Sequence, residues 1–459
     1  MQPRISQWPL TAFEEYMLCD DRPAYPMTGV FRLRLSGILD RNAFESALNS
    51  VVSRHYLLRC TVRPKPGRRP CWIDNPNWRP TVEWDAQCNR YGYPNMSFMD
   101  LTKAPGGRFW VVERKNSSDV VIQAHHSCTD AIGMCKVLEE LLVLYARNME
   151  APSLVGKLRE IDPIRFPMRG SSGSAPKIAL KLFDELLGTW QFLTRWPVPF
   201  TSKRTGLKES DMPEFFPASR TFELEEEESR LFFAAAKKLG ATVNNLLLRD
   251  LFLTVGAWRR ENREGSEQDW VRFAVPVNLR AEEDERLTMA NCVSMVFPEQ
   301  RMHELSNSHQ FLEKLHKEMV LNNESKLKTT YISSIDIVRR IPKLMTFISG
   351  HIKCFSTCVL SNVGNVLNNT SLPLRDGKIL AGNVVVEGID LFPPLRRNTQ
   401  LEVSVATYNK RLSLMLHFDP RCLSDDQGNG FLEKYVGQIR ESIASVKTGR
   451  DKKNSLRLN

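Results

Sequence analysis

The chain has 459 residues, of which 42% are hydrophobic and 25% charged, and its formal net charge is +10. This composition is that of a globular protein and excludes a disordered or fibrous chain, and the length allows two large lobes around a cleft. The basic residues form no nucleic-acid-binding module, no apolar run approaches the roughly 18 residues of a membrane span, and the N-terminus lacks the apolar region of a signal peptide.

Residues 1–165 are expected to form a first lobe. Helical periodicity covers residues 41–55, and two strands, 108–113 and 120–124, are expected to form a hairpin. A helix over 132–147 follows, with its apolar residues on one face.

Residues 166–219 are expected to be a crossover, or linker, between two lobes. Proline and glycine are dense over 151–177, which argues against a packed element there. One helix is predicted over 178–196.

The second lobe is expected over 220–446, followed by a basic, disordered tail over 447–459. Thr242 is the expected N-cap of a helix over 243–260. Further helices are expected over 309–349, broken at Pro342, and over 430–446, and strands over 220–224, 271–277, 357–361, 383–387, 401–407 and 412–418. Because strands alternate with long helices, the predicted class is α/β.

The most informative stretch follows the strand 120–124. His125 and His126 enter a short turn, and Asp130 lies four residues after His126, just before the helix. A histidine at a strand end is held rigidly, and its imidazole titrates near neutral pH, so His126 suits a general base that removes a proton from an alcohol or amine. Packing is the alternative role for such a histidine. No HExxH, GxSxG, Walker A or GxGxxG motif indicates another chemistry, and no metal site is expected.

The pattern resembles the His-His-x-x-x-Asp-Gly motif of the condensation-domain superfamily. This superfamily includes the condensation domains of nonribosomal peptide synthesis, wax-ester and diacylglycerol acyltransferases, alcohol acetyltransferases and chloramphenicol acetyltransferase. Further segments match it in its order along the chain: 9–15, 39–59, 275–280 with Asn291, and 360–365. The resemblance implies an α/β fold of two chloramphenicol-acetyltransferase-like lobes in a V, with a tunnel between them and the histidine motif at its middle.

The resemblance also implies roles for single residues. His126 is the implied catalytic base, and His125 supports the turn. Asp130 is implied to pair with Arg280 of the second lobe, whereas the residues alone also allow Asp130 to cap the following helix. Four residues are implied to line the tunnel and bind substrate: Ser361, Asn362, Gly364 and Asn291. Turn formation is the alternative for the Ser-Asn-x-Gly segment.

One position departs from the motif, because Ala131 stands where the family has glycine, and Gly133 follows two positions later. An alanine would hinder a positive φ or a close approach to the backbone, but it is an ordinary residue at the start of a helix. A catalytic role for Cys128, beside the histidines, competes with the usual inert, buried cysteine, which we favour.

The resemblance implies an acyltransferase without a tightly bound cofactor. It would move an acyl group from a thioester to an alcohol or amine and give an ester or amide. The donor would be acyl-CoA or a phosphopantetheine-bound acyl group on a carrier protein that acts in trans. A non-catalytic binding or scaffold protein is the alternative, and Ala131 favours it.

Location and further partners follow from composition. Ten cysteines without CxxC spacing indicate reduced thiols in a cytoplasmic protein. The basic excess suits an anionic donor, an acidic carrier protein or a membrane surface. Peripheral membrane contact through segments 178–196 and 338–352 is an alternative to their packing in the core.

Overall fold

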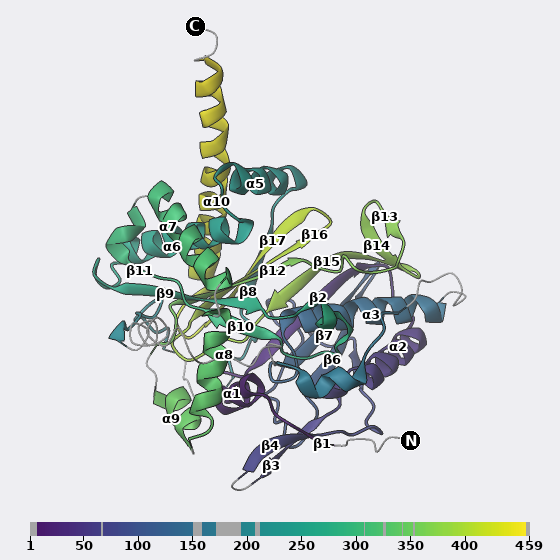
Figure 1. Ribbon diagram of the computed structural model, residues 1–459. Helices are drawn as coiled ribbons and strands as arrows, with labels where there is room; N and C mark the ends of the chain where they lie inside the picture. The colour runs from purple at the N-terminus through teal and green to yellow at the C-terminus, as the bar shows by residue number, and fades with distance from the viewer. Residues whose placement is uncertain are drawn as a thin grey trace.

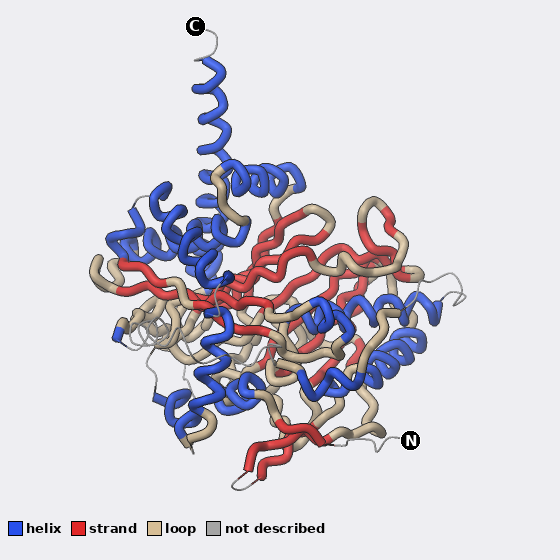
Figure 2. The backbone as a smooth tube through the Cα atoms, in the orientation of Figure 1, coloured by secondary structure: helices blue, strands red, loops and turns tan. Residues whose placement is uncertain are grey.

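The computed structural model describes residues 7–65, 68–149, 158–170, 194–206, 212–306, 308–324, 327–341, 343–351 and 354–455. Two large sheets lie in the interior, and most helices lie on the outside (Figure 1, Figure 2). Each sheet has its own large hydrophobic core. The predicted α/β class with two lobes is therefore confirmed, and we call the part built on each sheet the first and the second lobe.

The first sheet has the strand order β13-β14-β15-β2-β7-β6-β5. Its strands are β2 (Thr28–Ser36), β5 (Val82–Trp84), β6 (Gly107–Arg114), β7 (Ser117–His125), β13 (Leu374–Arg375), β14 (Lys378–Ala381) and β15 (Val384–Phe392). The predicted hairpin is β6 and β7, which pair antiparallel. β7 is buried along nearly its whole length, which explains its continuous apolar run, since a strand covered on both faces does not alternate.

The second sheet has the strand order β10-β9-β12-β16-β17-β8, and β11 also pairs with β9. Its strands are β8 (Ser219–Glu223), β9 (Trp270–Asn278), β10 (Val293–Val296), β11 (Glu299–Arg301), β12 (Cys358–Asn365), β16 (Leu401–Tyr408) and β17 (Arg411–Phe418). β12 runs parallel to both β9 and β16. The hairpin β16–β17 turns at Asn409 and Lys410, both with positive φ, as a two-residue hairpin turn requires. A small third sheet holds β1 (Gln7–Pro9), β3 (Thr61–Lys65) and β4 (Arg68–Ile73).

Helices cover the sheets. In the first lobe, α2 (Arg41–Arg54) packs on α3 (Ala131–Met149). The second lobe has the helices α5 (Glu226–Lys238), α6 (Val243–Glu261), α7 (Ser308–Glu324) and α10 (Asp425–Ser455). Helix α1 (Ala12–Asp20), from the start of the chain, contacts α8 (Leu327–Val338) and α9 (Leu344–His351). The Thr242 hydroxyl accepts from the amide of Asn245 and caps α6, as predicted. None of the described helices is long and apolar enough to cross a membrane.

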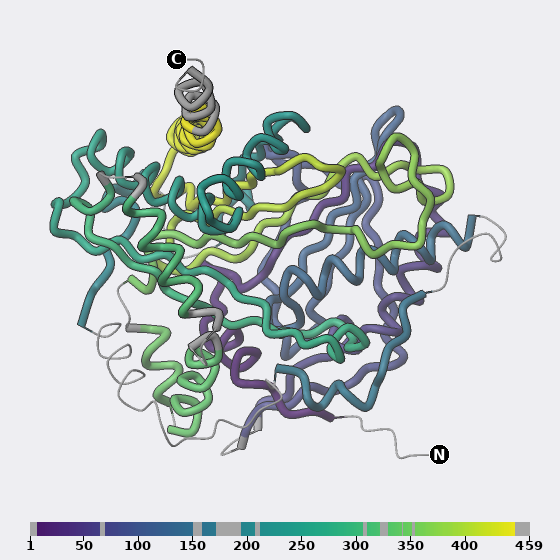
Figure 3. The backbone as a smooth tube through the Cα atoms, turned by 45° about the horizontal axis from the view of Figure 1, so that its top comes forward, coloured from purple at the N-terminus to yellow at the C-terminus, as the bar shows by residue number. Residues whose placement is uncertain are grey.

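The observed boundaries differ from the predicted ones in three places. β13–β15 lie within the predicted second lobe but extend the first sheet, because β15 pairs with β2; Figure 3 shows this chain beside the first lobe. Periodicity predicts a strand but not the strand it pairs with, so the pairing of β15 with β2 was not predicted. α10 projects from the body (Figure 1) and continues to Ser455, so much of the tail predicted as disordered is helical. Lysine and arginine in this tail favour helix.

The third difference concerns the predicted linker. A short 3-10 helix, Pro163–Met168, buries Phe166, and Arg169 forms an ion pair with Glu14 at 2.8 Å. Proline at the start of the turn is tolerated because the first amides of a helix have no internal partner. This part of the crossover is therefore packed. The helix predicted over 178–196 lies outside the described residues except for its last three.

Candidate active site

The turn after β7 is held by contacts from both lobes. The amide of His126 donates to the carbonyl of Met27 at 2.7 Å. From the second lobe, Asn291 Nδ2 donates to the carbonyls of His126 (2.8 Å) and Ser127 (3.0 Å). The backbone that carries the two histidines is therefore fixed at the boundary between the lobes.

The ring of His126 is oriented as a general base requires. Its Nδ1 lies 2.9 Å from the carbonyl oxygen of Thr129, and because a carbonyl only accepts, Nδ1 carries the proton and donates. Nε2 therefore keeps its lone pair. Burial lowers the pKa of His126 below its usual value, so the imidazole is neutral at neutral pH.

His125 lies behind the turn. Its side chain is fully buried, its Nδ1 accepts a hydrogen bond from the amide of Ser127 at 3.1 Å, and its Nε2 lies 3.2 Å from an Asp21 carboxylate oxygen. His125 is not among the residues that border the cavity described below. Its position suits the predicted role of supporting the turn rather than contact with a substrate.

Asp130 both caps α3 and pairs with Arg280, so the two predicted alternatives occur together. Its carboxylate accepts from the guanidinium of Arg280 at 2.8 and 2.9 Å and from the amides of Gly133 and Cys292, each at 2.8 Å. Burial alone would raise the pKa of Asp130, but Arg280 and these amides hold it below its usual value. Asp130 is therefore an anion that joins the lobes beside His126.

The departure from the motif does not strain the backbone. Ala131 is the first residue of α3 and is not among the described residues with a positive φ, so it occupies an ordinary helical position. The close approach occurs at Gly133 instead. A Cβ added there would lie 2.6 Å from Thr129 Oγ1 and 3.1 Å from the carbonyl oxygen of Ala290. The glycine that the site requires is thus Gly133.

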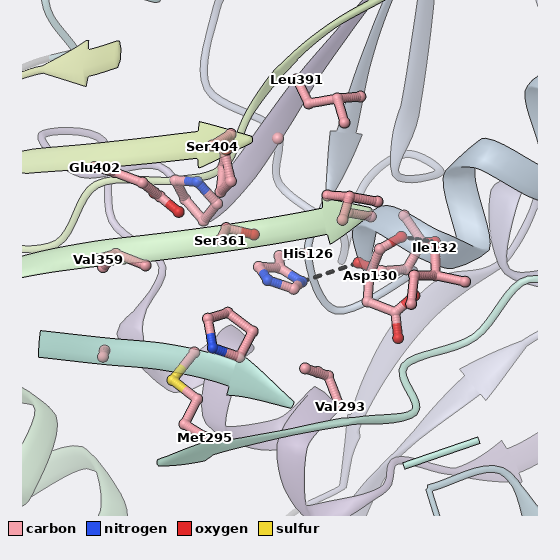
Figure 4. A pocket seen from close by; sticks show the side chains of 18 of the residues that line it. His126, Asp130, Ile132, Val293, Met295, Val359, Ser361, Leu391, Glu402 and Ser404 are labelled. Carbon is pink, nitrogen blue, oxygen red and sulfur yellow. Dashed lines mark hydrogen bonds between the residues drawn. The ribbon is translucent and has the colours of Figure 1, made fainter. Parts of the chain in front are cut away.

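A cavity of about 140 Å³ lies between the two sheets, with His126 on its wall (Figure 4). Both lobes contribute mostly apolar side chains, among them Phe31 and Leu391 from the first sheet and Pro276 and Val359 from the second. Such an apolar cavity with a few polar groups is typical of a small-molecule site. Among the residues that the structure describes, no group of three or more His, Cys, Asp or Glu is arranged to hold a metal ion.

Of the four residues expected to bind substrate, two line the cavity. Ser361 and Asn362 border it. Asn362 Oδ1 also accepts from the amide of Gly364 at 3.0 Å, and Gly364 has a positive φ, so the segment also makes the turn given as its alternative. Gly364 and Asn291 are not part of the described wall. Asn291 instead holds the histidine turn.

Polar residues of the wall that were not predicted from the sequence include two neighbours on β16. Glu402 and Ser404 of β16 point into the cavity (Figure 4). The alternation of polar and apolar residues over 401–405 was the available signal, but it is also typical of a strand with one solvated face. Cys128, by contrast, is fully buried away from the cavity, and burial raises the pKa of its thiol well above the usual value, as an inert cysteine requires.

Comparison with curated proteins finds two relatives, both uncharacterised proteins of Mycobacterium tuberculosis strains. Each is 26% identical over 280 residues, which make up 59% of this chain and 61% of the relative. The chain therefore matches less than two thirds of the length of these relatives. No family profile matches the chain.

Solved structures define the fold. The first condensation domain of the calcium-dependent antibiotic synthetase, in complex with a substrate analogue, is 15% identical, covers 95% of this chain and 97% of its own, and has a TM-score of 0.68. Trichothecene 15-O-acetyltransferase from Fusarium sporotrichioides is 12% identical, with 95% of each chain covered and a TM-score of 0.65. The epimerization domain from the third module of tyrocidine synthetase B is 13% identical, with 96% and 98% covered and a TM-score of 0.63.

The chain therefore has the fold of the condensation-domain and chloramphenicol-acetyltransferase-like superfamily, as its motif predicted. These three structures bear the names of different reactions, and a fold shared at such low identity does not choose among them.

Proposed function

We propose that the protein is an acyltransferase that moves an acyl group from a thioester to an alcohol or amine, with His126 as the general base. The observation that supports this best is the neutral ring of His126, whose Nδ1 is engaged by Thr129 and whose ring borders a cavity built by both lobes. The likeness to condensation domains and to an acetyltransferase is consistent with acyl transfer.

In the proposed reaction, His126 Nε2 removes the proton of the acceptor hydroxyl or amine while its oxygen or nitrogen attacks the thioester carbonyl carbon. The oxyanion that forms collapses, the C–S bond breaks, and the imidazolium returns the proton to the leaving thiolate. A positioned base contributes about 10²–10⁴-fold to such a step. Holding both substrates in one cavity contributes further, because it removes the entropy of bringing them together.

Asp130 and Arg280 act in this proposal as positioning residues. Their ion pair fixes the start of α3, and Thr129, which orients the ring of His126, directly precedes Asp130. The Thr129 carbonyl also stabilises the imidazolium that forms during the reaction, since it accepts from Nδ1–H in either state.

The co-substrate in this proposal is acyl-CoA or a phosphopantetheine-bound acyl group on a carrier protein in trans, and the protein needs no tightly bound cofactor. The net charge of +10 favours an anionic donor. A cytoplasmic location suits both donors.

A non-catalytic binding or scaffold protein of the same fold is the alternative. Ala131 was the feature that favoured it. Its ordinary helical position removes the argument from a positive φ, whereas its place on the cavity wall keeps the argument from a close approach of the substrate. The oriented tautomer of His126 and the paired Asp130 favour catalysis, because a scaffold has no need of a base in its cavity.

Thiol release from a panel of acyl-CoA and carrier-bound thioesters, with mixed alcohols and amines, tests the proposal. Wild type should release thiol, and His126→Ala should lose at least about 100-fold in rate. His303→Ala, which changes an exposed histidine outside the cavity wall, serves as the matched control and should match wild type. Equal release by wild type and a folded His126→Ala variant would remove His126 as the base, and release by neither would favour the scaffold.

A further inference from the structure

One wall of the cavity carries polar side chains that the proposed reaction does not use. Glu402 and Ser404 lie two residues apart on β16, so they share a face of the strand. On the neighbouring parallel strand β12, Ser361 is opposite Ser404 and Val359 is opposite Glu402. Glu402, Ser404 and Ser361 all border the cavity, and we call them the acidic wall (Figure 4).

Among the described residues, the polar groups of the acidic wall have no hydrogen-bond partner. Glu402 is 2% exposed and Ser404 is 1% exposed. Within the part of the chain that the structure describes, Ser404 Oγ has no hydrogen-bond partner, and Glu402 forms neither an ion pair nor a side-chain hydrogen bond. Buried polar groups are normally satisfied, and leaving them unsatisfied costs stability.

Glu402 differs from the other buried carboxylates that the structure describes, because it is not paired. The other fully buried acidic side chains in the described ranges have partners. Those with an arginine ion pair are Glu14, Asp20, Asp119, Asp130, Glu140, Asp250, Asp390 and Asp419. Glu264 accepts hydrogen bonds from Thr201 and Ser202 instead. Glu402 is thus the one buried carboxylate in the described ranges to which the protein supplies no partner.

No cation on the cavity wall is available to Glu402. Arg280 is engaged by Asp130, and Arg396 is engaged by Asp20. Burial therefore raises the pKa of Glu402 well above its usual range, and no charged group offsets this effect. The other titratable groups are His417, directly opposite Glu402 on β17, the buried thiol of Cys358 on β12, and the cavity-lining His126 and Cys292. Burial lowers the pKa of His417 to about 4, and its Nδ1 lies 2.8 Å from the carbonyl oxygen of Pro393, so it is a neutral neighbour. The substrate-free acidic wall is thus neutral and rich in acceptor oxygens.

We propose that the acidic wall binds an ammonium group of the acyl acceptor, so that the acceptor is an amino alcohol or a diamine. An ammonium group has three donors and no acceptor, which matches the Glu402 carboxylate and the hydroxyl oxygens of Ser404 and Ser361. The other end of the acceptor, a hydroxyl or a second amine, then reaches His126 across the same cavity. This identification of the ligand as the acceptor rests on the proposed acyl transfer.

Binding of an ammonium ion has a proton signature. Glu402 is protonated in the empty site and ionised when it pairs with the cation, so it gives its proton to the solvent. Near neutral pH the binding should release about one proton per ligand, and affinity should rise up to about tenfold per pH unit while the free carboxyl stays protonated. A diol of the same length should release none, because a neutral hydroxyl does not require an ionised Glu402.

Isothermal titration with α,ω-amino alcohols of three to eight carbons, and with diols of matched length, tests the proposal. Measurements in buffers of different ionisation enthalpy count the protons released. Wild type should bind the best-fitting amino alcohol more tightly than its diol, and Glu402→Gln should weaken amino alcohol binding at least about 30-fold while leaving diol binding within about threefold. Glu387→Gln, which changes a half-buried strand carboxylate outside the cavity that pairs with Lys378, is the matched control and should behave as wild type.

Several results would overturn the inference. These are equal affinity for diols and amino alcohols, no loss in Glu402→Gln, or no binding across the series. Proton release by wild type provides evidence that does not depend on the folding of any variant. Amino alcohol binding through Glu402 without acyl transfer from any thioester would refute the proposed function but keep the ammonium site. Acyl transfer that is unchanged in Glu402→Gln would keep the proposed function but refute the ammonium site.

Discussion

Replacing Asp130 with asparagine removes the charge that faces Arg280 but keeps the size of the side chain. The two side chains are 7% and 4% exposed, and two hydrogen bonds join them. Removal of one partner leaves the other as an uncompensated buried charge, which costs about 3–5 kcal/mol. Arg280→Met should cost less, about 2–3 kcal/mol, because the amides of Gly133 and Cys292 still satisfy Asp130.

The double variant Asp130→Asn/Arg280→Met leaves no charge unpaired. Its loss of stability should be smaller than the sum of the two single losses by about 2 kcal/mol or more, since residues in direct contact couple strongly. Urea unfolding followed by circular dichroism measures all four proteins, and thiol release follows the effect on His126. Additivity within about 0.5 kcal/mol would refute the view that the pair acts as a unit.

The same pair predicts a dependence on pH. The pKa of Asp130 in the folded protein lies below its usual value, because Arg280 and the amides outweigh burial. Its contribution to stability is therefore complete above the unfolded-state pKa of about 3.9 and is lost as the pH falls through the lower folded-state value. Asp130→Asn should flatten the fall in stability below about pH 4. If stability falls as steeply below about pH 4 in Asp130→Asn as in wild type, another carboxylate is responsible for the fall.

Three further predictions address the base, the turn and the surface. Because burial lowers the pKa of His126, the rate of acyl transfer should fall only as the pH drops below about 6.5, and an inflection above that value would contradict the neutral ring. Gly133→Ala should lower the melting temperature, because the added Cβ would lie 2.6 Å from Thr129 Oγ1. Gly430 lies on the exposed face of α10, and no atom outside its own stretch of helix lies within 4 Å of an added Cβ. Gly430→Ala should therefore raise the free energy of unfolding by about 0.5–1 kcal/mol. If the segment 338–352 contacts membranes, anionic liposomes should float wild type but not a variant with serine at the exposed Phe347; equal flotation of both would exclude this contact.

The local part of the site could be predicted from the sequence, because its chemistry is carried by neighbouring residues. His126 and Asp130 are four residues apart, and a strand followed by a helix positions both. Arg280 is distant in sequence, and only the resemblance to a family identified it as the partner. The choice between a cap and an ion pair for Asp130 could not be made from residue types, since one carboxylate has enough acceptor sites for both.

The distant part of the site could not be predicted. The alternation of leucine, valine and polar residues over 401–405 fits both a solvated face and a polar cavity wall, and the difference depends on what covers the strand. The place of β15 in the first sheet could not be predicted either, because its partner strand β2 lies about 350 residues earlier in the chain. Spacing along the chain carries no information about such pairings.

The position of the proposed base, His126, thus depends on both lobes. The first lobe supplies His126 and Thr129, whereas Arg280 and Asn291 of the second lobe hold Asp130 and the backbone of the turn. Because β15 pairs with β2 along most of its length, the first sheet is incomplete when the chain is divided at the crossover between the lobes. An isolated first lobe would expose the edge of β2 and lose the partners of its own motif. The proposed catalysis and the folding of the chain therefore depend on the same contacts between the lobes.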